Sequence, residues 1–176
     1  MMYLRIPLII AMAIGSTACQ SATKESESST TLARVLHNVK TTAYTHSEGD
    51  HLKHGASNAI GSTLKYGNVR SAAADWSVYP VGTKFKIQGE SSVYVVDDYG
   101  SALVGTHTID LYKPSKASMN SWGARKVNID VIEWGSYTRS LAILKPRAKS
   151  GKGIIRRMVS SIQQSLGTKG ALAESE

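Results

Sequence analysis

Cysteine is almost absent from this sequence, since Cys19 is the only one among 176 residues. No disulfide can therefore form within the chain. Long apolar runs are also missing, and the stretch from Ile6 to Ile14 is too short to cross a bilayer. Neither the Gly-rich patterns of nucleotide-binding loops nor the Gly-x-Ser-x-Gly pattern of serine hydrolases occurs. These absences argue against a disulfide-stapled scaffold, a nucleotide-binding enzyme and serine catalysis.

Residues 1–19 have the pattern of a secretory signal peptide. A single basic residue, Arg5, precedes the apolar run, and small residues follow it. Two processing outcomes stay open. Cleavage after the small residues 16–18 would release the protein, whereas Ala18-Cys19 resembles a bacterial lipobox, in which Cys19 would be lipidated and would anchor the protein in a membrane. We expect an exported protein of the periplasm or outer membrane, because Gln20 after a lipidated cysteine suggests outer-membrane sorting by analogy with Gram-negative lipoproteins.

The net charge of +8 raises the question of a nucleic-acid partner. Seven basic and two acidic residues fall within 145–176, whereas residues 20–144 hold 13 basic and 11 acidic ones. The positive charge therefore belongs to the tail and not to the central part of the chain. An exported protein with such a tail is expected to meet anionic envelope polymers or lipid headgroups, and we expect no nucleic-acid partner.

The composition divides the rest of the chain into three parts. Residues 20–36 are polar and Ser/Thr-rich, as in a flexible linker, residues 37–144 carry short apolar runs between Gly, Pro and Asp, and residues 145–176 form a basic tail. The runs predict short strands at 39–44, 84–88, 92–96, 102–105, 108–112, 127–134 and 141–144, and a short helix capped by Ser115 and ended by Gly123. The fold class is therefore all-β, a small barrel or sandwich.

The tail predicts an amphipathic helix over residues 154–167. Its apolar side chains recur with helical spacing and share one face: Ile154, Ile155, Met158, Val159, Ile162 and Leu166. Three placements stay open, namely on a membrane surface, docked on the β domain, or as a frayed helix in a mobile tail.

Three carboxylates in DDYGSALVGTHTIDLY, residues 97–112, form a candidate active site. Asp97 and Asp98 end one apolar run, and Asp110 lies within the next. If the two strands bring the acids together, each negative charge disfavours ionisation of its neighbour, so that one acid stays protonated and donates to a leaving oxygen. The alternative is that Asp97 and Asp98 form a turn and Asp110 accepts backbone hydrogen bonds.

The segment HSEGDHLKH, residues 46–54, is a candidate metal site. His51 and His54 lie three residues apart, and His46, Glu48 and Asp50 are close in sequence. The glycine and polar residues around them predict a loop, and a solvated loop without metal is the alternative. We expect no metal and no cofactor.

Several motifs, taken in order, resemble the three-aspartate (3D) domain, which occurs at the C-terminus of the membrane-bound lytic transglycosylase A family. They span residues 42–135 and read TAY (42–44), AIG (59–61), AADWSVYPVGTKFKI (73–87), VDDYGSALVGTHTIDLY (96–112) and SWGARKVNIDVIEWG (121–135). The resemblance implies a six-stranded double-psi β-barrel with a short helix. One departure is that the spacing from Gly105 to Asp110 is one residue longer than in many members.

The resemblance also implies roles for individual residues. The three aspartates would be Asp75, Asp98 and Asp110, with Asp110 as the catalytic acid and base and Asp98 polarising it or holding substrate. Substrate contacts would come from Asp75, Asp97, Tyr99, Gly100 and Gly105, although Asp75, before a turn, also suits a scaffolding role.

The implied reaction is lytic cleavage of the β-1,4 bond between N-acetylmuramic acid and N-acetylglucosamine in peptidoglycan, which gives 1,6-anhydro products. In the transglycosylases a second domain completes the glycan groove, and this chain has no room for it. Two alternatives therefore stay open: a peptidoglycan-binding module without turnover, and a metal-dependent hydrolase that uses His51 and His54.

Overall fold

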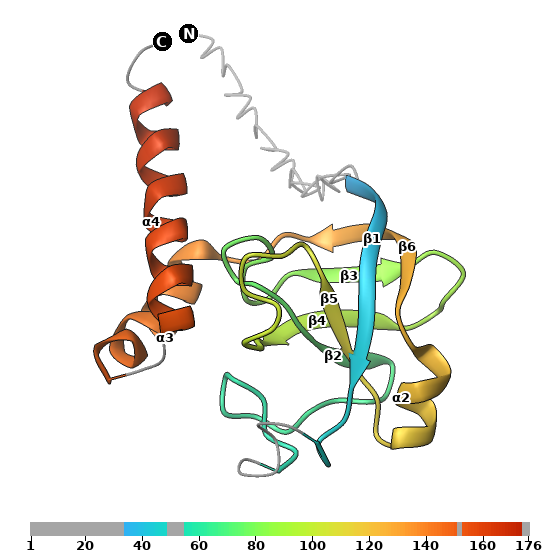
Figure 1. Ribbon diagram of the computed structural model, residues 1–176. Coiled ribbons are helices and arrows are strands. Elements are labelled where there is room, and N and C mark those ends of the chain that lie inside the picture. The colour runs from blue at the N-terminus through green and yellow to red at the C-terminus, as the bar shows by residue number, and fades with distance from the viewer. Residues whose placement is uncertain (1–33, 49–54, 151–152, 174–176) are drawn as a thin grey trace, which may run out of the picture. The chain divides into compact units, whose positions relative to one another are not determined.

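The computed structural model describes residues 34–48, 55–150 and 153–173 (Figure 1). The predicted signal peptide, Cys19 and the pair His51 and His54 lie outside these ranges. All described residues belong to one unit, residues 31–176. Within the described ranges, no helix has the length and apolarity needed to cross a membrane.

Six strands form a closed barrel, as the resemblance to the 3D domain implies. They are β1 (Arg34–Tyr44), β2 (Val69–Ala73), β3 (Lys84–Ile87), β4 (Val93–Asp98), β5 (Ile109–Tyr112) and β6 (Arg125–Glu133), in the order β1-β5-β2-β4-β3-β6. The pairs β1–β5 and β2–β4 are parallel, and the other four are antiparallel. This mixed topology brings strands from both ends of the domain side by side.

The barrel core follows the period-two alternation of its strands. Phe85 and Ile87 of β3 are buried and alternate with exposed lysines, and the rings of Phe85 and Tyr94 stack with centroids 5.4 Å apart. On β5, Ile109 and Leu111 join the same core, while Asp110 between them does not. Alternation therefore fixes which side of β5 carries the acid.

Two predictions about secondary structure are wrong, and one strand was not predicted. Residues 102–105 form a turn instead of a strand, because Gly105 has φ +86° and its N–H is donated to Asp75. Residues 141–144 belong to helix α3 (Tyr137–Ser150), which begins where the Ser136 hydroxyl accepts from the N–H of Arg139. Strand β2 was not predicted, because its sequence VRSAA is poor in β-branched and aromatic residues.

The other helices agree better with the sequence. Helix α2 (Lys116–Trp122) has Ser115 as its N-cap and Gly123 at its C-cap, as predicted. Helix α4 (Gly153–Ala173) contains the predicted amphipathic segment. Its Ile155, Met158 and Ile162 are buried in the same cluster as barrel residues, so docking is the placement that the structure adopts. Strand β1 begins at Arg34 and residue 144 lies inside α3, while the expected domain limits stay a prediction.

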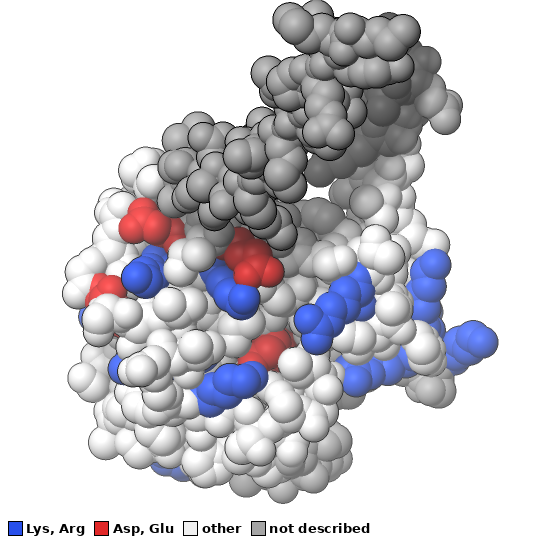
Figure 2. Space-filling view, turned by 180° about the vertical axis from the view of Figure 1, so that it is seen from behind, with Lys and Arg blue, Asp and Glu red and all other residues white. Residues whose placement is uncertain are grey.

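Charged side chains of both signs are interspersed on the surface. Figure 2 shows acidic groups lying among lysines and arginines on one face. Two ion pairs illustrate this mixture, Lys84 with Glu133 at 2.6 Å and Arg70 with Glu90 at 3.7 Å. The pattern agrees with the near balance of charge expected for the central part of the chain.

Candidate functional site

Strand register places Asp98 and Asp110 in one row across the sheet. Asp110 of β5 is opposite Thr42 of β1 and Ala73 of β2, and Ala73 is opposite Asp98 of β4. Opposed residues point to the same side of a sheet, so these four side chains, which we call the acid row, share a side. With one strand between them, the backbones of Asp98 and Asp110 lie about 10 Å apart.

A register shift between β2 and β4 explains how two consecutive aspartates, Asp97 and Asp98, can lie on the same side of the sheet. Ala72 is opposite Val96, but Ala73 is opposite Asp98, so Asp97 is an extra residue in β4. Asp97 nevertheless bonds to the hydroxyl of Ser71, two residues before Ala73 and therefore on the same side of β2. The bulge thus turns both acids toward one side of the sheet, a common use of bulges near active sites.

Asp98 is held by three donors. Its Oδ1 accepts from the backbone N–H groups of Ala59 (3.1 Å) and Tyr99 (2.9 Å), and its Oδ2 accepts from the Tyr44 hydroxyl (3.2 Å). The residue is only 5 % exposed. These three groups all donate, and carboxylate oxygens accept from such groups.

Asp110 is more accessible than the other two acids of this stretch. It is half-buried, and its Oδ1 accepts from the Thr42 hydroxyl at 2.7 Å. Asp97 and Asp98 are both buried. A ligand that approaches from solvent therefore reaches Asp110 first.

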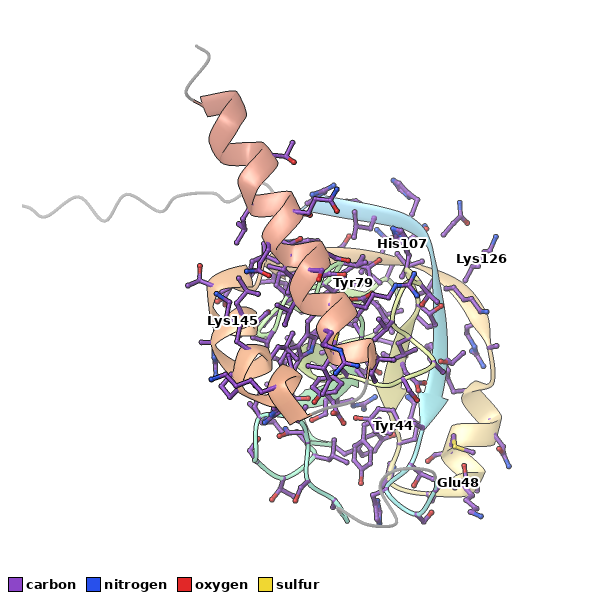
Figure 3. The ribbon with its side chains drawn as sticks, turned by 60° about the vertical axis from the view of Figure 1, so that its left-hand side comes forward. Tyr44, Glu48, Tyr79, His107, Lys126 and Lys145 are labelled. Carbon is purple, nitrogen blue, oxygen red and sulfur yellow. The ribbon has the colours of Figure 1, made fainter. Side chains whose placement is uncertain are left out.

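Tyr44 also belongs to the site. No role there was predicted for it from the sequence, although it is part of the TAY motif. It ends β1, two residues after Thr42, and its side chain is visible in Figure 3. Burial raises the pKa of its hydroxyl well above the usual value, and the charges of Asp98, Asp97 and Asp110 raise it further. Part of this rise in the pKa of Tyr44 thus comes from a negative potential to which all three acids contribute.

Asp97 holds the loop that borders the acid row. Its Oδ2 accepts from the Asn58 amide (2.9 Å), the Lys65 amine (2.8 Å) and the Ser71 hydroxyl (2.9 Å), and the residue is 1 % exposed. Asn58 also bonds to Ser62 within the same loop. These contacts give Asp97 a scaffolding role in this structure.

Asp75 forms hydrogen bonds with two turns of the chain. Its Oδ1 accepts from the N–H and hydroxyl of Ser77, and its Oδ2 accepts from the N–H of Gly105 at 2.6 Å. It is buried, so its contacts are with the protein itself. Asp75 thereby fixes the position of the turn at 102–105.

Tyr99, Gly100 and Gly105 likewise contact the protein scaffold. The Tyr99 ring packs edge-on against Trp76 at 5.1 Å, and its hydroxyl accepts from Arg147. A Cβ at Gly105 would lie 2.5 Å from the Arg157 guanidinium, so a side chain of α4 already occupies the approach to this glycine.

The candidate metal segment is described only in part. His46 Nδ1 lies 2.8 Å from the Tyr112 hydroxyl, and Glu48 forms an ion pair with Lys116 at 3.1 Å. Within residues 34–48, 55–150 and 153–173, no group of three or more His, Cys, Asp or Glu side chains could hold a metal ion. His51 and His54 lie outside those ranges.

Comparisons with known proteins find curated relatives, a solved structure and a family model. Two curated relatives from Bacillus subtilis (strain 168) each align over 118 residues. The cell wall-binding protein YocH is 31 % identical over 65 % of this chain and 37 % of its own length, and the putative cell wall shaping protein YabE is 33 % identical over 66 % and 28 %. This chain therefore spans only about a third of these relatives.

A solved structure and a family profile also match. The crystal structure of MltA from E. coli aligns over 44 % of this chain and 27 % of that chain, with 22 % identity and a TM-score of 0.35. The family described as 3D domain matches residues 70–133, which include Asp75, Asp98 and Asp110. Together with the motif order and the closed six-stranded barrel, this match identifies a 3D domain within the chain, at residues 70–133.

Proposed function

We propose that this protein acts on the bacterial cell wall and cleaves the glycan strands of peptidoglycan by lytic transglycosylase chemistry, with Asp110 as the reacting acid. The observation that carries the proposal is the acid row, in which a half-buried Asp110 shares one side of the sheet with a buried, triply bonded Asp98. The 3D-domain match and the cell-wall names of the two relatives support the substrate class.

A single carboxylate suffices for this reaction. Protonated Asp110 gives its proton to the oxygen of the β-1,4 bond as that bond breaks. The resulting carboxylate then takes the proton of the muramoyl C6 hydroxyl, whose oxygen attacks C1 and closes the 1,6-anhydro ring. No external water is needed, so one group serves where an ordinary glycosidase uses two.

Asp98 and Tyr44 supply the electrostatic setting. The transition state carries positive charge near C1 of the sugar. The same negative potential that raises the pKa of Tyr44 stabilises such a charge, and the Tyr44 hydroxyl and two backbone N–H groups keep Asp98 in position. Asp98 thus acts by charge and Asp110 by proton transfer.

A second candidate is a peptidoglycan-binding module that does not turn over its ligand. The description of one relative as a cell wall-binding protein favours it. In that case the acid row would contact sugar hydroxyls without proton transfer.

Location follows from the same proposal. We infer export by residues 1–19 to the cell envelope, in the periplasm or at the outer membrane. Lipidation of Cys19 would add a membrane anchor. Replacing Cys19 with serine should then abolish incorporation of a labelled fatty acid into the protein, and a protein that is released after cleavage would show no label before or after the change.

The test is digestion of purified peptidoglycan sacculi by the mature protein, with products identified by mass spectrometry. Asp110→Asn should lower the yield of anhydro-muropeptides at least about 100-fold, since general acid–base groups contribute this much or more. The matched control is Asp130→Asn, which changes a half-buried acid of β6 bonded to Gln88. Reducing-end products would indicate hydrolysis instead, and retention of both proteins on sacculi without any product would support the binding module.

A further inference from the structure

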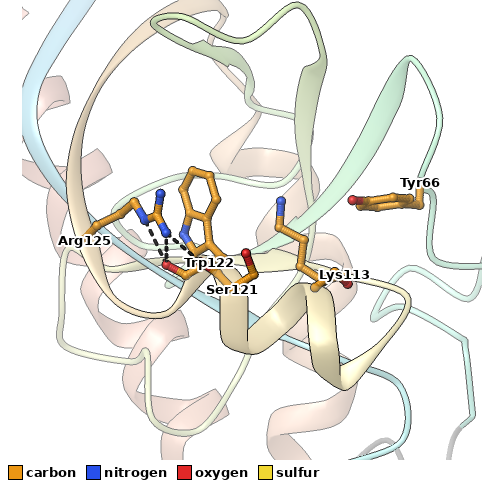
Figure 4. Close-up of a pocket in the computed structure, with 6 residues that line it drawn as sticks. Tyr66, Lys113, Ser121, Trp122 and Arg125 are labelled. Carbon is orange, nitrogen blue, oxygen red and sulfur yellow. Dashed lines mark hydrogen bonds between the residues drawn. The ribbon is translucent and has the colours of Figure 1, made fainter.

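A pocket of about 250 Å³ lies beside α2, and none of the chemistry above uses it (Figure 4). Two cations, two aromatic rings and two hydroxyls line it: Tyr66, Lys113, Ser118, Ser121, Trp122 and Arg125. Its residues come from the loop before β2, the end of β5, α2 and the start of β6. The topology of the barrel therefore assembles the pocket from separate segments.

Lys113 is an unusual lining residue because it is 5 % exposed and has no acidic partner among the described residues. Its amine lies 4.6 Å from the ring centre of Trp122 and 5.9 Å from that of Tyr66. Burial lowers its pKa from the usual lysine value, with a further lowering by Arg70 and Arg125 that Glu90 opposes. Buried lysines are ordinarily paired with an anion, so a ligand that carries an anionic group would supply the partner that Lys113 lacks among the described residues.

Arg125 places a second cation at the same pocket. Its guanidinium lies over Trp122, 4.3 Å from the ring centre, and donates to the carbonyl oxygens of Ser121 and Trp122. Those bonds hold it at the end of α2. Figure 4 shows the Lys113 amine and the Ser121 hydroxyl directed toward the same space beside Trp122.

An aromatic contact chain joins this pocket to the acid row. The ring of Tyr66 meets Tyr112 edge-on with centroids 6.3 Å apart, and Tyr112 meets Tyr44 at 5.6 Å. Tyr44 in turn donates to Asp98. Three tyrosine rings therefore connect the pocket with the acid row.

We propose that the pocket between Lys113 and Arg125 binds a carboxylate of the peptide stem carried by the glycan strand on which the acid row acts. This inference rests on the proposed function for the identity of the ligand. Lys113 pairs with the carboxylate, and the serine hydroxyls donate to it. Arg125, which Figure 4 shows on the other side of Trp122, adds positive charge at the wall of the pocket, and Trp122 and Tyr66 pack against the aliphatic part of the peptide. The small volume suits one amino-acid group of a branch better than a further stretch of the glycan backbone.

The test compares two soluble probes by calorimetry with the full mature chain. One is a GlcNAc-MurNAc disaccharide with its tetrapeptide, and the other is the same disaccharide without the peptide. The native protein should bind the first at least about tenfold more tightly, as a charge-assisted contact predicts. Lys113→Gln should remove this preference, and amidation of the peptide carboxylates should have the same effect on the native protein.

The matched control is Lys145→Gln, which removes one positive charge from an exposed position of α3 and should leave the preference intact. Arg125→Gln, at an exposed position, repeats the test if Lys113→Gln does not fold. Equal affinity of the native protein for both probes would overturn the proposal, as would an unchanged preference in both variants. Displacement of the peptide probe by poly(glycerol phosphate) at lower concentration than by free peptide would also overturn it, in favour of a phosphate polymer.

This outcome is separable from that of the proposed function. Cleavage of sacculi that depends on Asp110, together with equal affinity for the probes, would contradict only the peptide pocket. A peptide preference without cleavage would contradict only the enzymatic proposal.

Discussion

Replacing Asp97 with asparagine tests whether Asp97 has a structural role, in contrast to the reacting role proposed for Asp110. The change keeps the size of the side chain and removes its charge. Asp97 accepts from Asn58, Lys65 and Ser71 through a single oxygen, and it lies beside Asp98 in the bulge of β4. If its role is to hold the loop that contains Asn58 and Lys65, the substitution should lower the stability of the protein and leave the chemistry of Asp110 intact.

The expected loss follows from the three hydrogen bonds. A bond to a charged group contributes about 1 kcal/mol more than a bond to a neutral one, so the buried contacts with Asn58 and Ser71 together account for about 2 kcal/mol. The Lys65 side chain is 41 % exposed, which limits its share to less than about 1 kcal/mol. We therefore expect Asp97→Asn to lower the free energy of unfolding by about 2–3 kcal/mol, or the melting temperature by roughly 4–12 °C.

Urea denaturation followed by tryptophan fluorescence measures this loss, and hydrogen exchange shows whether the amides of residues 56–65 open first. Asp130→Asn again serves as the control and should change the unfolding free energy by less than about 1 kcal/mol. The argument fails if Asp97→Asn leaves stability unchanged. It also fails if the folded variant no longer binds or cleaves glycan, because Asp97 would then be a substrate contact.

Two further predictions concern the barrel. Gly135→Ala should lower the unfolding free energy by about 3 kcal/mol, because the new Cβ would lie 2.3 Å from the Pro80 carbonyl oxygen and 2.5 Å from that of Val81. The control is Gly67→Ala, whose Cβ would lie in open space and which should not change the unfolding free energy measurably in the same denaturation assay. Burial raises the pKa of Tyr94 from 10.0 to about 12, so the folded state holds a proton that the unfolded state releases, and stability should fall by about 2 kcal/mol between pH 10 and 12. Tyr94→Phe should flatten this part of the stability–pH curve, and an unchanged slope would contradict the assignment.

Much of the barrel was predictable because its strands alternate clearly. The alternation of apolar and polar residues in KFKI and IDLY predicts which side chains are buried. Ser115 and Gly123 predict where α2 begins and ends. Residues 141–144 show the limit of this approach, because a run of four apolar residues fits a strand and a helix equally well. The signal that decides it is Ser136, whose hydroxyl caps the helix five residues earlier.

The acid row was predictable only in part. The sequence places Asp98 and Asp110 at adjacent apolar runs, but the strand between them, β2, is too weak in β propensity to be recognised. Tyr44, the tyrosine that donates to Asp98, belongs to a strand more than fifty residues earlier in the sequence, and the order of strands in the barrel brings the two residues together. The pocket at Lys113 was missed for the same reason, since its residues come close only in the closed barrel.

The closure of the barrel has a consequence for how the chain folds. Arg34 of the first strand pairs with Val131 of the last, and Thr41 pairs with Ile109. Such long-range pairing must wait until nearly the whole domain is available, and folds of this kind form in milliseconds to seconds instead of microseconds. Until β6 arrives, β1 and β3 each keep an open edge that can pair with another chain. The protein is therefore most prone to aggregate before the barrel closes. A chaperone that covers the open edge of β1 during this interval would reduce aggregation.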